Sequence, residues 1–218
     1  MRIGVIHATL NAVEPLVRAL KEADSNIEAC NYVNEELLFH ANHAGGVDDW
    51  GLRNFYRLFM QAAESAVDGI IIACSLYSAY AQEASKLTGK PVIAIDQPMI
   101  EEAVAFGEKI GILATTSSAG PVEEMKILKQ AEKMGRDIKT QVLVRPDAFS
   151  ALKNGNKNRH NEILKEAAQE LKKLSCDTIV LSQITMACAK KEIEELGIKV
   201  LSSPDSGANW IISCINDR

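Results

Sequence analysis

The sequence lacks the features that would place it in a membrane or in an oxidising compartment. No apolar run approaches the roughly 20 residues that a helix needs to span a bilayer, and residues 1–6 enter a strand-like run without the long apolar region of a signal peptide. The five cysteines are an odd number, widely spaced, and form no C-x-x-C pair. This pattern argues against a disulfide framework or a zinc ribbon and favours reduced thiols. We therefore expect a cytoplasmic protein with no membrane partner.

Aromatic residues and positive charge are also scarce. Aromatic side chains make up 5% of the 218 residues, and the net charge of −5 is spread along the chain without a basic stripe. A nucleic-acid partner is therefore not expected. The length suffices for a full core, in one large domain or two small lobes.

Strand-like and helix-like stretches alternate throughout the chain. This alternation predicts parallel strands joined by crossover helices, hence an α/β fold. The predicted strands are 2–7, 27–33, 69–73, 91–95, 109–114, 139–144, 177–181 and 198–201. The predicted helices lie near 12–23, 50–66, 76–88, 98–106, 121–134, 158–174, 187–196 and 205–215. Two long polar segments, 40–50 and 145–158, are interpreted as loops that could cover a site.

The strand segments repeat in the same order. Ile3 begins a segment that recurs at Ile110, 107 residues later, and the strands that end before Cys74 and Gln183 correspond at an offset of 109. The repeat predicts two pseudo-symmetric parallel-sheet lobes with the active-site cleft between their strand ends. We expect a first lobe over 1–97, joined by the C-terminal helix 205–218, and a second lobe over 98–204.

Cys74 follows the most apolar strand, 69–73, which is typical of a strand buried on both faces. Ligands of open α/β sheets bind beyond the carboxyl ends of the strands. A helix starting after Cys74 would favour the thiolate and attract a carboxylate. Cys74 could instead be a small packing residue, as we expect of Cys30, Cys176 and Cys214.

The chain resembles the aspartate/glutamate racemase superfamily, which includes hydantoin and glutamate racemases, maleate isomerases and arylmalonate decarboxylases. The resemblance covers essentially the whole length, and its motifs are 3–7, 73–75, 111–115 and 179–183. It implies two lobes that enclose a small carboxylic acid without a cofactor. It also implies one cysteine from each lobe, one removing a proton from the α-carbon and the other returning a proton on the opposite face.

Cys74 matches the first of these cysteines, whereas Gln183 stands where the resemblance places the second. Gln183 has no proton to transfer at neutral pH, which puts symmetric two-thiol racemisation in doubt. Cys188 lies five residues later, more than one helical turn away, and is a poor substitute. Gln183 is therefore expected to orient the substrate.

The other candidate site residues lie in turns after predicted strands. His7 is an acid or base, a donor to the substrate, or a structural imidazole bonded to the backbone. The candidate substrate-binding residues are Thr9, Asn11, Ser75, Tyr77, Thr115, Thr116, Ser117 and Thr185. His40 and His43 have metal-like spacing only on a helix, and we expect no metal at this polar segment.

These observations predict a cofactor-independent racemase-like isomerase acting at the α-carbon of a small carboxylic acid or amino acid, with Cys74 as acid and base. A one-thiol decarboxylase, a cis–trans isomerase and a non-catalytic carboxylate-binding protein remain alternatives. The resemblance implies a homodimer, and the predicted helix 50–66 supports one because it is rich in large apolar residues: Trp50, Phe55, Tyr56, Phe59 and Met60.

Overall fold

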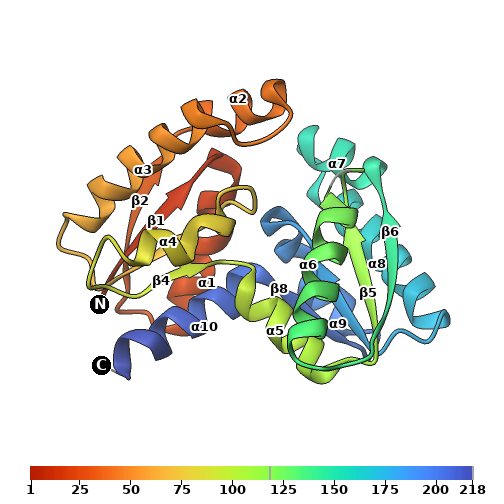
Figure 1. Ribbon diagram of the computed structural model, residues 1–218. Helices are drawn as coiled ribbons and strands as arrows, with labels where there is room; N and C mark the ends of the chain where they lie inside the picture. The colour runs from red at the N-terminus through yellow and green to blue at the C-terminus, as the bar shows by residue number, and fades with distance from the viewer. Residues whose placement is uncertain (118, 218) are drawn as a thin grey trace. The chain divides into compact units, whose positions relative to one another are not determined.

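The apolar runs of the sequence form two parallel sheets, as a computed structural model of residues 1–117 and 119–217 shows (Figure 1). Arg218, the last residue of the predicted C-terminal helix, lies outside this part of the chain. The first sheet has the order β2-β1-β3-β4 and the second the order β6-β5-β7-β8. The predicted α/β class with two parallel-sheet lobes is confirmed.

Every predicted strand is present, with each end within one residue of its expected place. The strands are β1 (Arg2–His7), β2 (Glu28–Val33), β3 (Gly69–Ile72), β4 (Val92–Ala94), β5 (Lys109–Ala114), β6 (Lys139–Val144), β7 (Thr178–Leu181) and β8 (Lys199–Ser202). The α-helices are α1 (Val13–Ala23), α2 (Glu36–Ala44), α3 (Asp49–Ala63), α4 (Ala81–Ser85), α5 (Gln97–Phe106), α6 (Ala119–Lys133), α7 (Pro146–Lys153), α8 (Lys157–Lys173), α9 (Lys190–Glu194) and α10 (Ser203–Asn216). The described residues also form the short 3-10 helices η1 (Leu10–Ala12), η2 (Ser78–Tyr80) and η3 (Ile184–Ala189).

Contacts along the chain divide it into two compact units. Unit 1 comprises Met1–Pro98 and Pro204–Arg218, and unit 2 comprises Met99–Ser203. Of the helices in the described part of the chain, none is both long and apolar enough to cross a bilayer.

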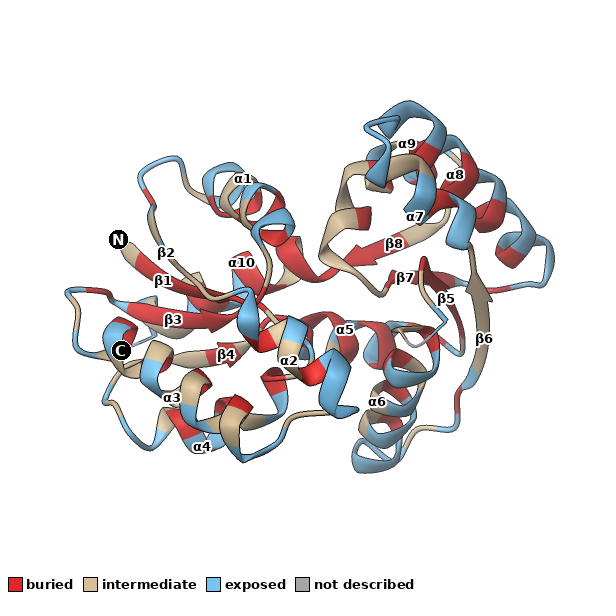
Figure 2. Cartoon of the chain, turned by 90° about the horizontal axis from the view of Figure 1, so that it is seen from above, coloured by how far each residue is buried: buried red, intermediate tan, exposed pale blue. Residues whose placement is uncertain are grey.

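In unit 1, α1 and α10 lie on one side of the sheet and α3 and α4 on the other (Figure 2). The core on the α3 side includes Ile70, Ile72 and Phe55, all fully buried. On the other side, α10 packs so closely on β3 that a Cβ at Gly69 would lie 3.0 Å from Ile211 Cδ1. The last helix of the chain therefore completes the core of the unit that contains the N-terminus.

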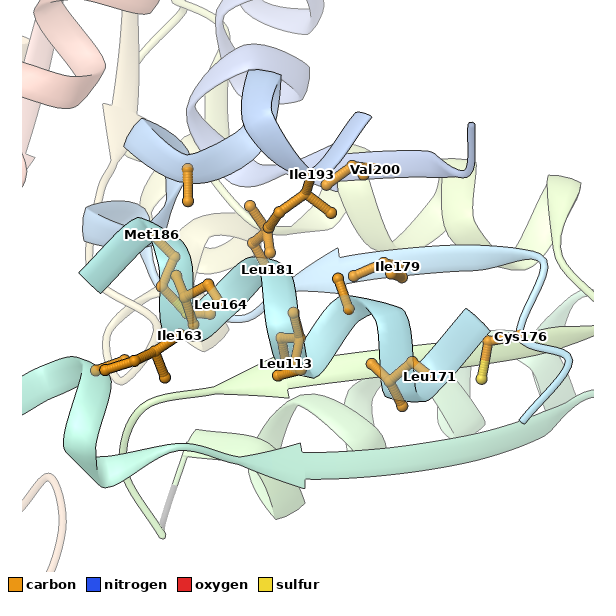
Figure 3. Packing of buried hydrophobic residues seen from close by; sticks show 14 residues of the cluster. Leu113, Ile163, Leu164, Leu171, Cys176, Ile179, Leu181, Met186, Ile193 and Val200 are labelled. Carbon is orange, nitrogen blue, oxygen red and sulfur yellow. The ribbon is translucent and has the colours of Figure 1, made fainter. Parts of the chain in front are cut away.

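In unit 2, α7, α8 and α9 pack on one face of the sheet around the cluster in Figure 3, where Leu164 and Leu171 of α8 lie beside Leu113 and Ile179. The opposite face holds a second cluster, in which Ile112 and Val180 meet α5 and α6. Both faces of the central strands are thus apolar, which explains why these strands could be recognised as continuous hydrophobic runs.

The two predicted loops are largely helical, so this expectation is wrong. Residues that favour turns act here as helix ends. Gly45 ends α2 with a φ of 75°, and the Asp48 carboxylate accepts a hydrogen bond from the Gly51 N–H at the start of α3. Pro146 is the first residue of α7, and Asn156 caps α8. Several helix ends within a short segment look like a polar loop in the sequence.

Candidate active site

Cys74 and Gln183 stand at equivalent places in their own units. Cys74 lies two residues beyond Ile72, the end of β3, and Gln183 two residues beyond Leu181, the end of β7. The intervening residues continue the sheet in the same way. The Ala73 N–H donates to the Ile6 carbonyl at 2.9 Å, and the Ser182 N–H donates to the Leu113 carbonyl at 3.0 Å. Each side chain therefore emerges at the carboxyl edge of a central strand, where α/β proteins bind ligands.

The chain turns sharply after Cys74, whose carbonyl accepts hydrogen bonds from the N–H groups of Tyr77 and Ser78, at 3.0 and 2.8 Å. The predicted helix 76–88 is instead the short η2 followed by the five residues of α4. The expected long helix that would act on the thiol through its dipole is therefore absent at this position. Cys74 is half-buried and Ser75 is exposed.

Tyr77 belongs to the core of unit 1. Its side chain is 1% exposed, its ring stacks on Phe55 with centroids 5.1 Å apart, and its hydroxyl donates to the Leu37 carbonyl at 3.3 Å. Burial, with a smaller contribution from Cys74, raises the pKa of Tyr77 to about 12. This expected substrate contact is accordingly a packing residue.

Asp96 is a buried carboxylate at the same edge that the sequence reasoning missed. It lies two residues beyond β4, is 5% exposed, and accepts a hydrogen bond from the Ser78 hydroxyl at 3.4 Å. An acidic residue directly after a short apolar strand was the signal available in the sequence.

His7 ends β1 and is fully buried. Its Nε2–H donates to Asn31 Oδ1 at 2.9 Å, and Nδ1 has no hydrogen-bond partner within the described residues. Burial lowers the pKa of His7, so the imidazole is neutral near pH 7. In the next turn, the Thr9 hydroxyl accepts a hydrogen bond from the N–H of Asn11, which is exposed.

In unit 2, Gln183 is paired with Thr115, the residue after β5. The Gln183 Oε1 accepts one hydrogen bond from the Thr115 N–H at 2.7 Å and a second from its hydroxyl at 2.9 Å. Both donors of Thr115, which is 2% exposed, are thereby used. Thr115 supports Gln183 rather than offering donors to a ligand, whereas Thr116 is half-buried and Ser117 is exposed.

Cys188 lies in η3, and its thiol is held by unit 2 itself. Its Sγ lies 3.3 Å from both acceptors, Asn161 Oδ1 and the Thr185 carbonyl oxygen. The Asn161 amide in turn donates to Glu192 Oε1 at 2.6 Å. This network connects α8 with η3 and α9.

His40 and His43 lie one turn apart on α2, so their metal-like spacing does occur on a helix. His40 Nε2 lies 2.9 Å from Asp48 Oδ2, and His43 Nδ1 donates to the Phe39 carbonyl at 2.8 Å. Residues 1–117 and 119–217 contain no group of three or more histidine, cysteine or acidic side chains arranged to hold a metal ion.

A family model for Asp/Glu/hydantoin racemase matches residues 3–210 of this sequence. The chain belongs to this racemase family. Comparison with curated proteins found no significant match.

Solved structures of racemases have the same fold. An aspartate racemase homologue from Pyrococcus horikoshii OT3 matches with a TM-score of 0.74 at 16% identity, covering 99% of both chains. Allantoin racemase from Klebsiella pneumoniae matches with a TM-score of 0.73 at 18% identity, covering 99% of this chain and 88% of its own. Glutamate racemase from Bacillus anthracis matches with a TM-score of 0.72 at 15% identity, covering 99% and 81%. Family membership supports a racemase-like function for the chain.

Proposed function

We propose that this racemase-family chain catalyses cofactor-independent proton transfer at the α-carbon of a small carboxylic acid or amino acid, with Cys74 as the acid and base. The observation that carries this proposal is the half-buried Cys74 thiol at the carboxyl end of the central strand β3. A thiolate at that place is suited to a substrate bound beyond the strand ends.

In the proposed reaction, the Cys74 thiolate takes the proton from the α-carbon, and the electron pair of the broken C–H bond spreads into the adjacent carboxylate. The thiol so formed returns a proton to the same carbon from the same side. Gln183, at the equivalent position of unit 2, has no proton to give at neutral pH. Because the Cys74 thiol exchanges its proton with water before it gives one back, this step exchanges the α-hydrogen with solvent and retains configuration, and it has a net product only when another bond of the substrate breaks or rearranges.

A single acid–base group also suits a decarboxylase or a cis–trans isomerase. In a decarboxylation, the C–C bond to a carboxylate breaks, CO₂ leaves, and the Cys74 thiol protonates the resulting carbanion on one face. The carboxamide of Gln183 in place of a thiol favours these one-face reactions over symmetric racemisation. A carboxylate-binding protein without chemistry is the alternative outside enzymes.

The candidate substrate contacts are the exposed or half-buried polar residues of the strand-end turns. They are Thr9, Asn11, Ser75, Thr116, Ser117 and Thr185. His7 is buried at the end of β1 as a neutral imidazole. We propose that it positions the turn that follows this strand.

The test uses heavy water and enantiopure acids, with proton NMR following the loss of the α-hydrogen and chiral chromatography following configuration. Cys74→Ser should abolish exchange, while Cys188→Ser, which changes a thiol bound to Asn161, should retain it. Exchange that survives in Cys74→Ser would overturn the proposal. Binding of acids without exchange, decarboxylation or isomerisation would favour the binding protein.

We also propose a homodimer. Phe55 and Phe59 of α3 are fully buried in the core of unit 1. Tyr56 and Met60 pack against this core but remain half-buried, and they line a hollow on the surface of the helix with Leu52 and Arg53. Sedimentation velocity at micromolar concentrations tests the assembly, and Met60→Glu should shift it toward monomer. A wild-type monomer throughout this range would contradict it.

A further inference from the structure

The orientation of the Gln183 carboxamide is decided by its contact with Thr115. A backbone N–H can only donate, so the Gln183 atom 2.7 Å from the Thr115 nitrogen must be the carbonyl oxygen, Oε1. The Thr115 hydroxyl donates to the same oxygen at 2.9 Å. Turning the carboxamide over would place Nε2–H against the Thr115 N–H, two donors facing each other, and would keep only a hydrogen bond from Nε2 to the hydroxyl. The orientation is therefore locked.

This lock leaves Gln183 as a donor. Both lone pairs of Oε1 are used by Thr115, and the two N–H bonds of Nε2 remain. Within residues 1–117 and 119–217, no hydrogen-bond partner is found for Nε2, and the side chain is half-buried. Gln183 therefore presents two N–H donors at the strand edge of unit 2 and no acceptor.

The group that meets these donors must accept hydrogen bonds. A carboxylate or carbonyl oxygen does so, whereas an ammonium has three donors and no acceptor. A desolvated contact between the amide N–H groups and an ammonium would leave donors on both sides without partners, which is costly.

We propose that Gln183, locked by Thr115, is a specificity-determining residue that binds a carboxylate or carbonyl oxygen and disfavours a free ammonium on the reacting carbon. The preferred substrates are then small acids whose nitrogen is acylated or absent, rather than free amino acids. This inference rests on the proposed function, and it takes Gln183 to face the position of the α-nitrogen, since an amino acid that turned a carboxylate to Gln183 would satisfy the same donors.

The test compares the binding of succinate and N-acetylaspartate with that of aspartate by isothermal titration calorimetry. Wild type should bind the first two acids at least about tenfold more tightly than aspartate, as expected for one unpaired polar group. Gln183→Glu keeps the acceptor for Thr115 and replaces the two donors with a second oxygen. This variant should bind succinate and N-acetylaspartate at least about tenfold more weakly than wild type does, and it should no longer prefer them to aspartate. Gln169→Glu, an exposed position on α8, makes the same chemical change and should alter neither affinity.

A second measurement addresses the lock itself. The side-chain NH₂ signals of Gln183, assigned by their absence in Gln183→Glu, should shift when succinate binds to wild type. Thr115→Val removes the hydroxyl and should weaken succinate binding, while Thr115→Ser keeps the hydroxyl and should restore it. These readouts separate an oriented carboxamide from a merely structural role.

An unchanged preference in a folded Gln183→Glu variant would overturn the inference, as would tighter binding of aspartate than of either acid by wild type, or no binding of the two acids at millimolar concentration. The proposed function fails by a different result, namely exchange that persists in Cys74→Ser. Loss of exchange in Cys74→Ser together with an unchanged preference in Gln183→Glu would remove this inference alone.

Discussion

Cys74 and Gln183 are equivalent residues of the repeated sheet, each two positions beyond the third strand of its unit. A thiol at position 183 would place an ionisable acid–base group at the strand end of unit 2 that corresponds to Cys74 in unit 1. The shorter side chain would also release the two Thr115 donors that now bind the carboxamide oxygen.

We therefore expect Gln183→Cys to convert a reaction that retains configuration into one that racemises the product. Chiral chromatography of an exchanged substrate measures this change, and Gln183→Ser serves as the control without a thiol. Products of unchanged configuration from an active Gln183→Cys variant would contradict the proposal that residue 183 acts on the substrate of Cys74.

The five thiols should differ in reactivity. Cys176 is 5% exposed, and burial raises its pKa, so it should react slowly. We expect iodoacetamide to label half-buried Cys74 at least about tenfold faster than Cys176, as measured by peptide mass spectrometry. Labelling of the urea-unfolded chain, in which the difference should vanish, is the control. Faster labelling of Cys176 than of Cys74 in the folded protein would refute this order.

The buried imidazole of His7 should make stability depend on pH. Because burial lowers its pKa, the folded protein binds this proton less readily than the unfolded chain, in which histidine titrates near pH 6.5. The unfolded state then binds more protons below that pH, so the contribution of neutral His7 to the free energy of unfolding is present above about pH 6.5 and lost as the pH falls.

Urea unfolding at pH 7.5 and 5.5 tests this expectation. The free energy of unfolding of wild type should fall on acidification, and that of His7→Gln should fall less. At pH 7.5 the variant should be less stable than wild type by about 1–3 kcal/mol, because a buried hydrogen bond has changed. His43→Gln, at an exposed site on α2, should keep the wild-type dependence. Equal pH dependence of His7→Gln and wild type would rule out the proposed protonation effect.

The C-terminal helix should contribute strongly to the stability of unit 1. Ile211 of α10 is fully buried and contacts the backbone region of Gly69 in β3. Ile211→Ala should lower the free energy of unfolding by about 2–5 kcal/mol, through lost burial and a new cavity. Asn209→Ala, exposed on the same helix, should change it by less than about 0.5 kcal/mol. Similar losses in the two variants would mean that α10 packs more loosely than described.

The sequence by itself determined the strands, the α/β class and the two repeated sheets. Buried parallel strands such as 69–72 are short runs of apolar residues, and this signal is local. The repeat from Ile3 to Ile110 is also visible without coordinates, and so is the position of Cys74 after its strand. Helices α2 and α7 were not predicted, because their polar ends resemble loops in the sequence.

Only the tertiary structure decided what the site residues do. Thr115 and Gln183 are 68 positions apart, and no local pattern indicates that one uses both its donors on the other. Tyr77 looked like a ligand contact from its place in the chain, but stacking on Phe55 puts it in the core. His7 is neutral because of burial by residues distant in sequence. Hydrogen-bond partners and desolvation depend on which segments the folded chain brings together, whereas strand and helix propensities act between neighbours.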